Sequence, residues 1–248
     1  MVERDDRAPV TTFFSVAPFA AGAVATLGEG PAHHARVKRL SAGDVVRLTD
    51  GHGRVGIGAV SVIQRSGLDV AIERVDVMDR PGTIHLCVPI GDRERMLWIA
   101  EKATELGVAT WQAVRFRRSG SVSCRGEGAA FAAKVRSRMI SALEQSGGGW
   151  LPEVLTDTTL AGLTSVTGAL TILLDADGMP LLSLLGNGPH ASATVLFGPE
   201  GGLEPSESEA LVTSGWLRAR LATTTLRFET AGIAAIAVLR ASHLLTET

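Results

Sequence analysis

A glycine-rich segment stands directly after a β-like run in the C-terminal part of the chain. Residues 193–197 have the length and character of a strand, and three glycines fall within the next five residues, in Gly198-Pro199-Glu200-Gly201-Gly202-Leu203. Because glycine has no side chain, a ligand can approach such a main chain closely. Its N–H and C=O groups could then recognise an adenine or a ribose. The alternative is an ordinary connection to a helix that begins near Pro205, a residue suited to a first helical turn.

A second segment, residues 226–231, joins the last expected strand to the last expected helix and reads Leu-Arg-Phe-Glu-Thr-Ala. Glu229 and Thr230 lie near the start of that helix, where an acid and a hydroxyl satisfy free N–H groups and interact favourably with the helix dipole. We therefore interpret Glu229 as a helix cap rather than a catalyst. Arg227 has no comparable local role, which makes it the candidate for chemistry that needs a cation.

One apparent nucleotide-binding motif has the wrong context. Residues 51–56 match the spacing G-x-G-x-x-G, but residues 57–63 after them are rich in β-forming side chains. The dinucleotide motif needs a helix start at that point to bind pyrophosphate. We therefore predict a hairpin turn here. The sequence also contains no G-x-S-x-G and no Gly-Lys pair, so neither a hydrolase nor a P-loop enzyme is indicated.

The N-terminal part of the chain reads as short strands separated by turns. Strands are expected at residues 45–49, 55–63 and 68–75, within a β-rich region that extends over residues 13–77. Arg80-Pro81-Gly82 ends this region, because proline restricts the residue before it and glycine permits a turn. The sequence therefore predicts a small β domain at residues 1–80.

From residue 81 onward, strands alternate with helices. Strands are expected at residues 83–90, 110–116, 171–174, 193–197 and 217–221, and helices at 92–106, 129–145, 205–213 and 229–245. This alternation predicts an α/β domain at residues 81–248 with a mostly parallel sheet. Ligands of such sheets bind at the carboxyl ends of the strands. Both segments described first follow expected strands at that end.

Composition excludes several classes of protein. The chain has 248 residues and 45% hydrophobic content, without the run of about 20 apolar residues that spans a bilayer. Residues 1–6 lack the layout of a signal peptide, and we expect a soluble, cytoplasmic protein. The two cysteines, Cys87 and Cys124, form no C-x-x-C pair, and the adjacent His33 and His34 cannot share one face of an element. No metal site is therefore expected.

Charge is unevenly distributed along the chain. Lys and Arg number 10 against 10 Asp and Glu in residues 1–80, 10 against 6 in residues 81–150, and 4 against 10 in residues 151–248. The basic middle part suits phosphate contacts, although a solvated surface explains it as well. The candidate RNA-binding residues are Arg36, Lys38, Arg39, Arg115, Arg117 and Arg118.

Taken together, the two C-terminal segments resemble the signature loops of the bacterial 16S rRNA uridine-N3 methyltransferases, a family of the SPOUT superfamily. The resemblance extends over nearly the whole chain in the same order. Further matching positions are His33-His34, Arg39-Leu40, Gly43-Asp44, residues 102–108, Arg118-Ser119, Glu144-Gln145-Ser146 and Pro152-Glu153-Val154.

The resemblance implies a PUA-like β-barrel for RNA binding, followed by a SPOUT-type α/β domain with a deep trefoil knot, and a homodimer. It implies S-adenosylmethionine as methyl donor and ribosomal RNA or the small ribosomal subunit as substrate. The residues that it assigns to the cofactor are Leu174, Asp175, Phe197, Gly198, Pro199, Glu200, Gly201, Gly202, Leu203, Leu221, Thr225 and Leu226.

Uridine N3 must lose its proton before it can attack a methyl group, and a cation would stabilise the resulting negative charge on the base. We predict this role for Arg227, alone or with a cation from a partner subunit. The chain departs from the family where arginines are usual: at residues 147–150, which read Gly-Gly-Gly-Trp, at Thr224, and at Thr12. Two alternatives therefore stay open, a related knotted methyltransferase with another RNA target and a catalytically silent RNA-binding paralogue.

Overall fold

The computed structural model describes residues 10–119, 126–163, 169–185 and 192–244. Cys124 and the end of the last expected helix at residue 245 lie outside these ranges. The chain divides into two compact units: Met1–Arg80 with Leu143–Leu151, and Pro81–Ala142 with Pro152–Thr248.

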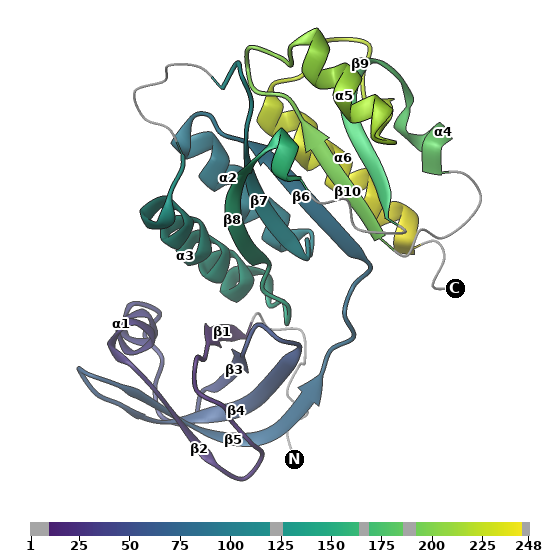
Figure 1. Ribbon diagram of the computed structural model, residues 1–248. Helices are drawn as coiled ribbons and strands as arrows, with labels where there is room; N and C mark the ends of the chain where they lie inside the picture. Colours follow the sequence, from purple (N-terminus) through teal and green to yellow (C-terminus); the bar gives the residue numbers. More distant parts are fainter. Residues whose placement is uncertain (1–9, 120–125, 164–168, 186–191, 245–248) are drawn as a thin grey trace. The chain divides into compact units, whose positions relative to one another are not determined.

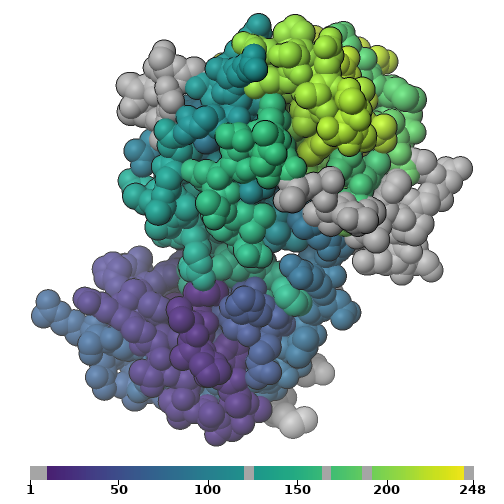
Figure 2. All heavy atoms as spheres, viewed as in Figure 1, coloured from purple at the N-terminus to yellow at the C-terminus, as the bar shows by residue number. Residues whose placement is uncertain are grey.

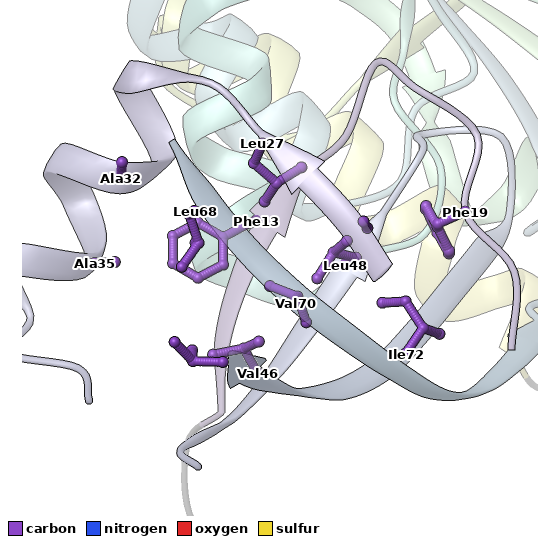
Figure 3. Packing of buried hydrophobic residues seen from close by; sticks show 12 residues of the cluster. Phe13, Phe19, Leu27, Ala32, Ala35, Val46, Leu48, Leu68, Val70 and Ile72 are labelled. Carbon is purple, nitrogen blue, oxygen red and sulfur yellow. The ribbon is translucent and has the colours of Figure 1, made fainter. Parts of the chain in front are cut away.

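The first unit contains a five-stranded sheet that curls around a hydrophobic core. Its strands lie in the order β1 (Thr11–Phe14), β3 (Val45–Thr49), β4 (Arg54–Ile63), β5 (Leu68–Val77) and β2 (Val24–Leu27). The β1–β3 pair is parallel and the other pairs are antiparallel. Alternate side chains of a strand face the same side, and Phe13, Leu48 and Val70 converge in the core, each fully buried (Figure 3).

A helix in this unit was absent from the sequence-based prediction, which expected only strands. Helix α1 extends over Glu29–Val37. Pro31 lies in its first turn, where a missing N–H costs no helical hydrogen bond. Ala32 and Ala35 are one turn apart and fully buried, so this short helix is held by packing on the sheet core rather than by helix propensity (Figure 3).

The segment with the G-x-G-x-x-G spacing is the turn between β3 and β4, which confirms the hairpin prediction. The Asp50 carboxylate accepts hydrogen bonds from the N–H groups of His52 at 2.7 Å and Arg54 at 3.1 Å. Gly51 and Gly53 have φ values of 74° and 93°, which only glycine adopts readily. Strand β4 follows, so no helix start is available for a phosphate.

Trp150, in one of the segments that lack the usual arginines, packs against this hairpin. Its indole N–H donates to the carbonyl oxygens of Met78 at 3.1 Å and Asp79 at 3.0 Å. The Arg80 guanidinium lies 5.2 Å from the ring centroid, in cation–π range. Trp150 therefore has a structural role within the first unit.

The second unit contains a parallel six-stranded sheet. The strands lie in the order β11 (Leu217–Arg220), β9 (Leu170–Pro180), β10 (Ser192–Phe197), β6 (Thr83–Pro89), β7 (Thr110–Arg115) and β8 (Glu153–Thr159). Every pair is parallel, in agreement with the mostly parallel sheet that the sequence predicts. Strand β8 was missed because it is an edge strand without a continuous apolar run: none of its side chains is fully buried.

Helices cover both faces of this sheet (Figure 1). They are α2 (Arg93–Glu105), α3 (Ala129–Ser146), α4 (Leu181–Leu185), α5 (Pro205–Thr213) and α6 (Phe228–Leu244), with a 3₁₀ turn, η1, at Leu160–Gly162. Helices α2 and α6 pack against each other, and α6 lies on β10 and β6. On the other face, Leu211 of α5 and Trp216 pack against Leu196 of β10 and Leu173 of β9.

The order of the strands creates a crossing of the chain at the carboxyl ends of the sheet. Strand β11 is outermost, whereas the next element, α6, packs on β10 and β6. Residues 221–227 must therefore return past the ends of β9 and β10. Sites of α/β sheets form at this edge, where neighbouring strands lead the chain in different directions.

The half-buried carboxyl of Glu144 makes stability depend on pH. Burial raises its pKa, more than the hydrogen bond from the Phe14 N–H at 2.8 Å and the nearby His34 lower it. An acid whose pKa is higher in the folded state destabilises the fold at pH above both of its pKa values, and this cost disappears as the pH falls through them.

We therefore expect wild type to gain stability relative to Glu144→Gln as the pH falls from about 8 towards about 4, near the unfolded pKa of Glu. Chemical denaturation at several pH values measures the two free energies of unfolding. A difference that stays constant with pH would contradict the prediction.

Candidate active site

A cavity of about 530 Å³ lies at the carboxyl ends of β9, β10 and β11. Its walls come from three segments: residues 174–176 in β9, residues 197–203 after β10, and residues 219–228 between β11 and α6. A volume of this size is typical of pockets for ligands such as nucleosides and their derivatives. Residues 221–227, which cross the ends of the strands, thus form one side of a space of ligand size.

Eleven of the twelve residues that the resemblance assigns to a cofactor line this cavity, and so does Arg227. The exception is Gly201, whose carbonyl accepts a hydrogen bond from Arg118 instead. Ala222 and Thr224, within the expected loop at residues 221–226, also line it, whereas sequence reasoning missed the other lining residues, which are Arg95, Ala176, Ser208, Ala219, Arg220, Phe228 and Ala231. Most of them are small or adjoin a predicted residue, whereas Arg95 comes from α2.

The glycine segment leaves β10 in a tight turn. The Gly202 N–H donates to the Pro199 carbonyl at 2.8 Å, and Gly202 has a φ of 69°. A Cβ atom at Gly198 would lie 2.4 Å from the Leu203 Cδ1 atom, so a larger residue there would displace Leu203 from the cavity wall. The glycines therefore set the shape of the cavity and keep main-chain groups accessible to a ligand.

Arg95 connects two carboxylates beside the cavity. Its Nη1 atom lies 3.5 Å from Glu200 Oε1 and 3.7 Å from Glu229 Oε2. The Glu229 side chain is only 10% exposed, and within the described residues its Oε2 atom has no hydrogen bond. Glu229 thus lies in the first turn of α6, as the sequence predicts. Within the described residues its side chain forms this ion pair rather than a capping hydrogen bond.

A second ion pair lies on the β9 side of the cavity. Asp175 Oδ2 lies 3.5 Å from Arg218 Nε, and Arg218 donates to the Ser208 hydroxyl at 2.9 Å. Asp175 and Glu200 therefore place two acidic groups on the cavity wall, next to the apolar side chains of Leu174 and Phe197. This combination suits a ligand with an aromatic part and hydrogen-bond donors, which are both features of S-adenosylmethionine.

Arg227 differs from the other arginines of the site. Its side chain is exposed, and the described part of the chain provides no hydrogen bond or ion pair to its guanidinium. A cation that is not already neutralised can stabilise negative charge on a ligand at the cavity mouth. The structure thus makes Arg227 available for the chemistry that we predicted.

The candidate RNA-binding arginines have protein partners yet remain accessible. Arg36 donates to the Gln64 carbonyl at 2.6 Å, Arg115 pairs with Glu127, and Arg117 pairs with Glu204 at 3.1 Å. The Arg115 and Arg117 side chains are 45% and 69% exposed, so each can still reach a phosphate. Lys38 and Arg39 are exposed at the end of α1.

Other chemistry finds little support in the described ranges. They contain no group of three or more His, Cys, Asp and Glu side chains that could hold a metal ion. Burial raises the pKa of the Cys87 thiol to about 12, which leaves it a poor nucleophile. None of the helices described is long and apolar enough to cross a membrane.

Comparisons with known proteins agree with this arrangement. The family model described as an RNA methyltransferase domain matches residues 78–240, and the one described as an RNA methyltransferase PUA domain matches residues 30–73. The chain is 29% identical over 230 residues to the ribosomal RNA small subunit methyltransferase E of Mycobacterium bovis, covering 87% of this chain and 85% of the relative.

Two solved structures share the fold over almost their whole length. The ribosomal RNA small subunit methyltransferase E of Neisseria gonorrhoeae, bound to S-adenosyl methionine, is 25% identical with a TM-score of 0.84, covering 94% of this chain and 98% of that one. A predicted RNA methyltransferase of Thermotoga maritima is 28% identical with a TM-score of 0.72, covering 94% and 99%.

Proposed function

The chain belongs to the RNA methyltransferase family, and from this premise we propose that it methylates the N3 atom of a uridine in 16S rRNA of the small ribosomal subunit, with S-adenosylmethionine as donor. The names of the relatives in Mycobacterium bovis and Neisseria gonorrhoeae support the donor and the ribosomal substrate. The observation that carries the proposal is the cavity itself, which unites both signature loops and includes Arg227, whose guanidinium has no partner within the described residues.

The cavity wall would hold the cofactor through two kinds of contact. Leu174, Phe197 and Leu203 provide apolar surface for an adenine, and the main chain of residues 198–202 provides donors and acceptors. The carboxylates of Asp175 and Glu200 can accept hydrogen bonds from hydroxyl or amino groups of the cofactor while keeping their arginine partners. When bound, S-adenosylmethionine supplies an electrophilic methyl group, so the work of the protein is mainly to position the groups that react.

Arg227 would act on the RNA base. Loss of the N3 proton leaves negative charge on the uridine oxygens, and a guanidinium near these oxygens lowers the energy of that state. Arg95 is shared by the carboxylates of Glu200 and Glu229, and Arg220 donates to the Gly178 carbonyl. Within the described residues Arg227 has no such partner, so it is the cation best able to serve the substrate. It would be the catalytic residue.

The same proposal assigns residues 1–80 to RNA recognition and residues 81–248 to catalysis, in a cytoplasmic homodimer whose C-terminal domain contains a trefoil knot. The return of residues 221–227 across the sheet supports the knot. Partly exposed apolar side chains on α2 and α6 support the dimer: Trp98 is 44% exposed, and Ile233 and Val238 are half-buried. Arg36, Lys38, Arg39, Arg115, Arg117 and Arg118 would contact phosphates.

Methyl transfer from labelled S-adenosylmethionine to small ribosomal subunits tests the proposal directly. The subunits come from a strain that lacks this gene, and mass spectrometry identifies the modified base. We expect label on uridine N3. Label on another base or another RNA would favour a related methyltransferase, and cofactor binding without transfer to any RNA would favour a silent paralogue.

Arg227→Ala should lower turnover by at least about a hundredfold, the usual effect of removing one group that stabilises transition-state charge. The dissociation constant of S-adenosylmethionine, measured by calorimetry, should hardly change, because Arg227 acts on the base. Arg227→Lys retains the charge and should recover part of the rate. Undiminished turnover in Arg227→Ala would remove Arg227 from the mechanism.

Arg39 has an unfavourable backbone conformation that a functional side chain would explain. Its φ is 58°, the one positive value among the non-glycine residues described, at the end of α1 where glycine is preferred. The left-handed conformation costs an L-residue about 1–2 kcal/mol, and the greater chain entropy of glycine cancels part of the gain. Arg39→Gly should therefore raise the free energy of unfolding by about 0.5–1 kcal/mol, while weakening RNA binding. Lys38→Ala, at a position with φ −75°, should weaken RNA binding without this gain in stability. Unchanged RNA affinity in Arg39→Gly would exclude the phosphate contact.

A further inference from the structure

The turn after strand β7 connects a candidate RNA-binding surface to the cavity. Residues 116–119 form a tight turn, in which the Phe116 N–H donates to the Ser119 hydroxyl at 3.0 Å and the Ser119 N–H donates to the Phe116 carbonyl at 3.1 Å. Phe116 is 3% exposed and Ser119 8%, so the turn is anchored at both ends. Arg117 and Arg118 between them are exposed.

Arg117 fastens this turn to the start of α5. Its N–H donates to Glu207 Oε1 at 2.8 Å, and the other oxygen of the same carboxylate accepts from the Glu204 N–H at 3.0 Å. Glu207 is 7% exposed, so its carboxylate is a buried junction between the turn and the helix start. In Figure 2 the teal segment after β7 lies against the yellow-green α5. Helix α5 follows directly on the glycine segment of the cavity wall.

Arg118 reaches the glycine segment itself. Its Nη1 atom donates to the Gly201 carbonyl at 3.2 Å. The two backbones also approach closely, since a Cβ atom at Gly201 would lie 3.3 Å from Arg118 Cβ and 3.4 Å from its carbonyl oxygen. Gly201 stands between Glu200 and Gly202, which both line the cavity. One exposed arginine therefore holds the wall of the candidate cofactor site from outside.

We infer that phosphate binding at Arg118 and cofactor binding in the cavity reinforce each other through the Arg118–Gly201 contact. The inference rests on the proposed function. It adds that RNA and cofactor each raise the affinity of the protein for the other, whichever of them binds first.

The direction of the coupling follows from the chemistry of arginine. A guanidinium carries five N–H donors, and the Gly201 contact uses one of them, so a phosphate can bind Arg118 without breaking that contact. Without phosphate, the side-chain entropy that is lost when an exposed arginine is fixed is about as large as the free energy gained from one such hydrogen bond. The Arg118–Gly201 contact alone therefore stabilises the glycine segment only weakly. Charge-assisted bonds to a phosphate would fix Arg118 in place and thereby stabilise the glycine segment in its cavity-lining conformation. Occupation of the cavity would order Gly201 in turn, because such coupling is reciprocal.

The test measures the dissociation constant of S-adenosylhomocysteine, an unreactive probe, with and without saturating small ribosomal subunits from a strain that lacks the gene. Equilibrium dialysis with labelled probe gives both values. We expect the subunits to tighten binding at least about fivefold, the lower end of known allosteric couplings. The ratio of the dissociation constant without subunits to that with subunits should fall to about one in Arg118→Ala, measured at subunit concentrations raised to saturation.

Arg115→Ala is the matched control. Arg115 is also exposed and also a candidate phosphate contact, but its partner Glu127 does not belong to the cavity wall. This variant should bind subunits more weakly and keep the full ratio. A ratio of one in wild type, or the same ratio in wild type and Arg118→Ala, would overturn the coupling while leaving the proposed function standing. Failure of the probe or of the subunits to bind at all would overturn the proposed function and the coupling with it.

Discussion

The order of strands in the parallel sheet is the constraint on which the site depends. Because β11 lies at one edge while α6 packs on β10 and β6, residues 221–227 have to pass the carboxyl ends of β9 and β10. That passage forms one wall of the cavity, and the glycine segment after β10 forms another. Neither segment could form the site alone, since the cavity is lined by residues of both.

Charge around the cavity is arranged so that most arginines are already paired. Arg218 binds Asp175, Arg95 lies between Glu200 and Glu229, and Arg117 binds Glu204. These pairs hold the loops around the cavity in place. Two further arginines line the cavity: Arg220 donates to the Gly178 carbonyl, whereas within the described residues the guanidinium of Arg227 has neither a hydrogen bond nor an ion pair. This distribution separates the charge pairs that hold the cavity wall from a residue that can serve an anionic base.

Local patterns were sufficient to predict most of the second unit. The buried runs of β6 and β10 and the apolar spacing in α2 are each visible in the sequence. Helix α1 and strand β8 were missed because neither has a strong pattern of its own: α1 depends on two buried alanines, and β8 is an edge strand. The glycine loop could be identified as a candidate because it has three glycines within five residues. Arg227 could be identified because the sequence around it gives it no local structural role. The role of Arg95 could not, because its partners lie far away along the chain and only the fold brings them together.

The central claim is that the cavity at the carboxyl ends of β9 and β10 binds S-adenosylmethionine, and titration calorimetry on cavity-filling variants tests it most directly. Ala222 lines the cavity, whereas Ala210 is exposed on α5 outside it. The account predicts binding of one S-adenosylmethionine per chain in wild type and in Ala210→Trp, and at least about tenfold weaker binding in Ala222→Trp, a loss of about 1.4 kcal/mol. Equal affinity in all three proteins would contradict it, because the cofactor would then have to bind elsewhere.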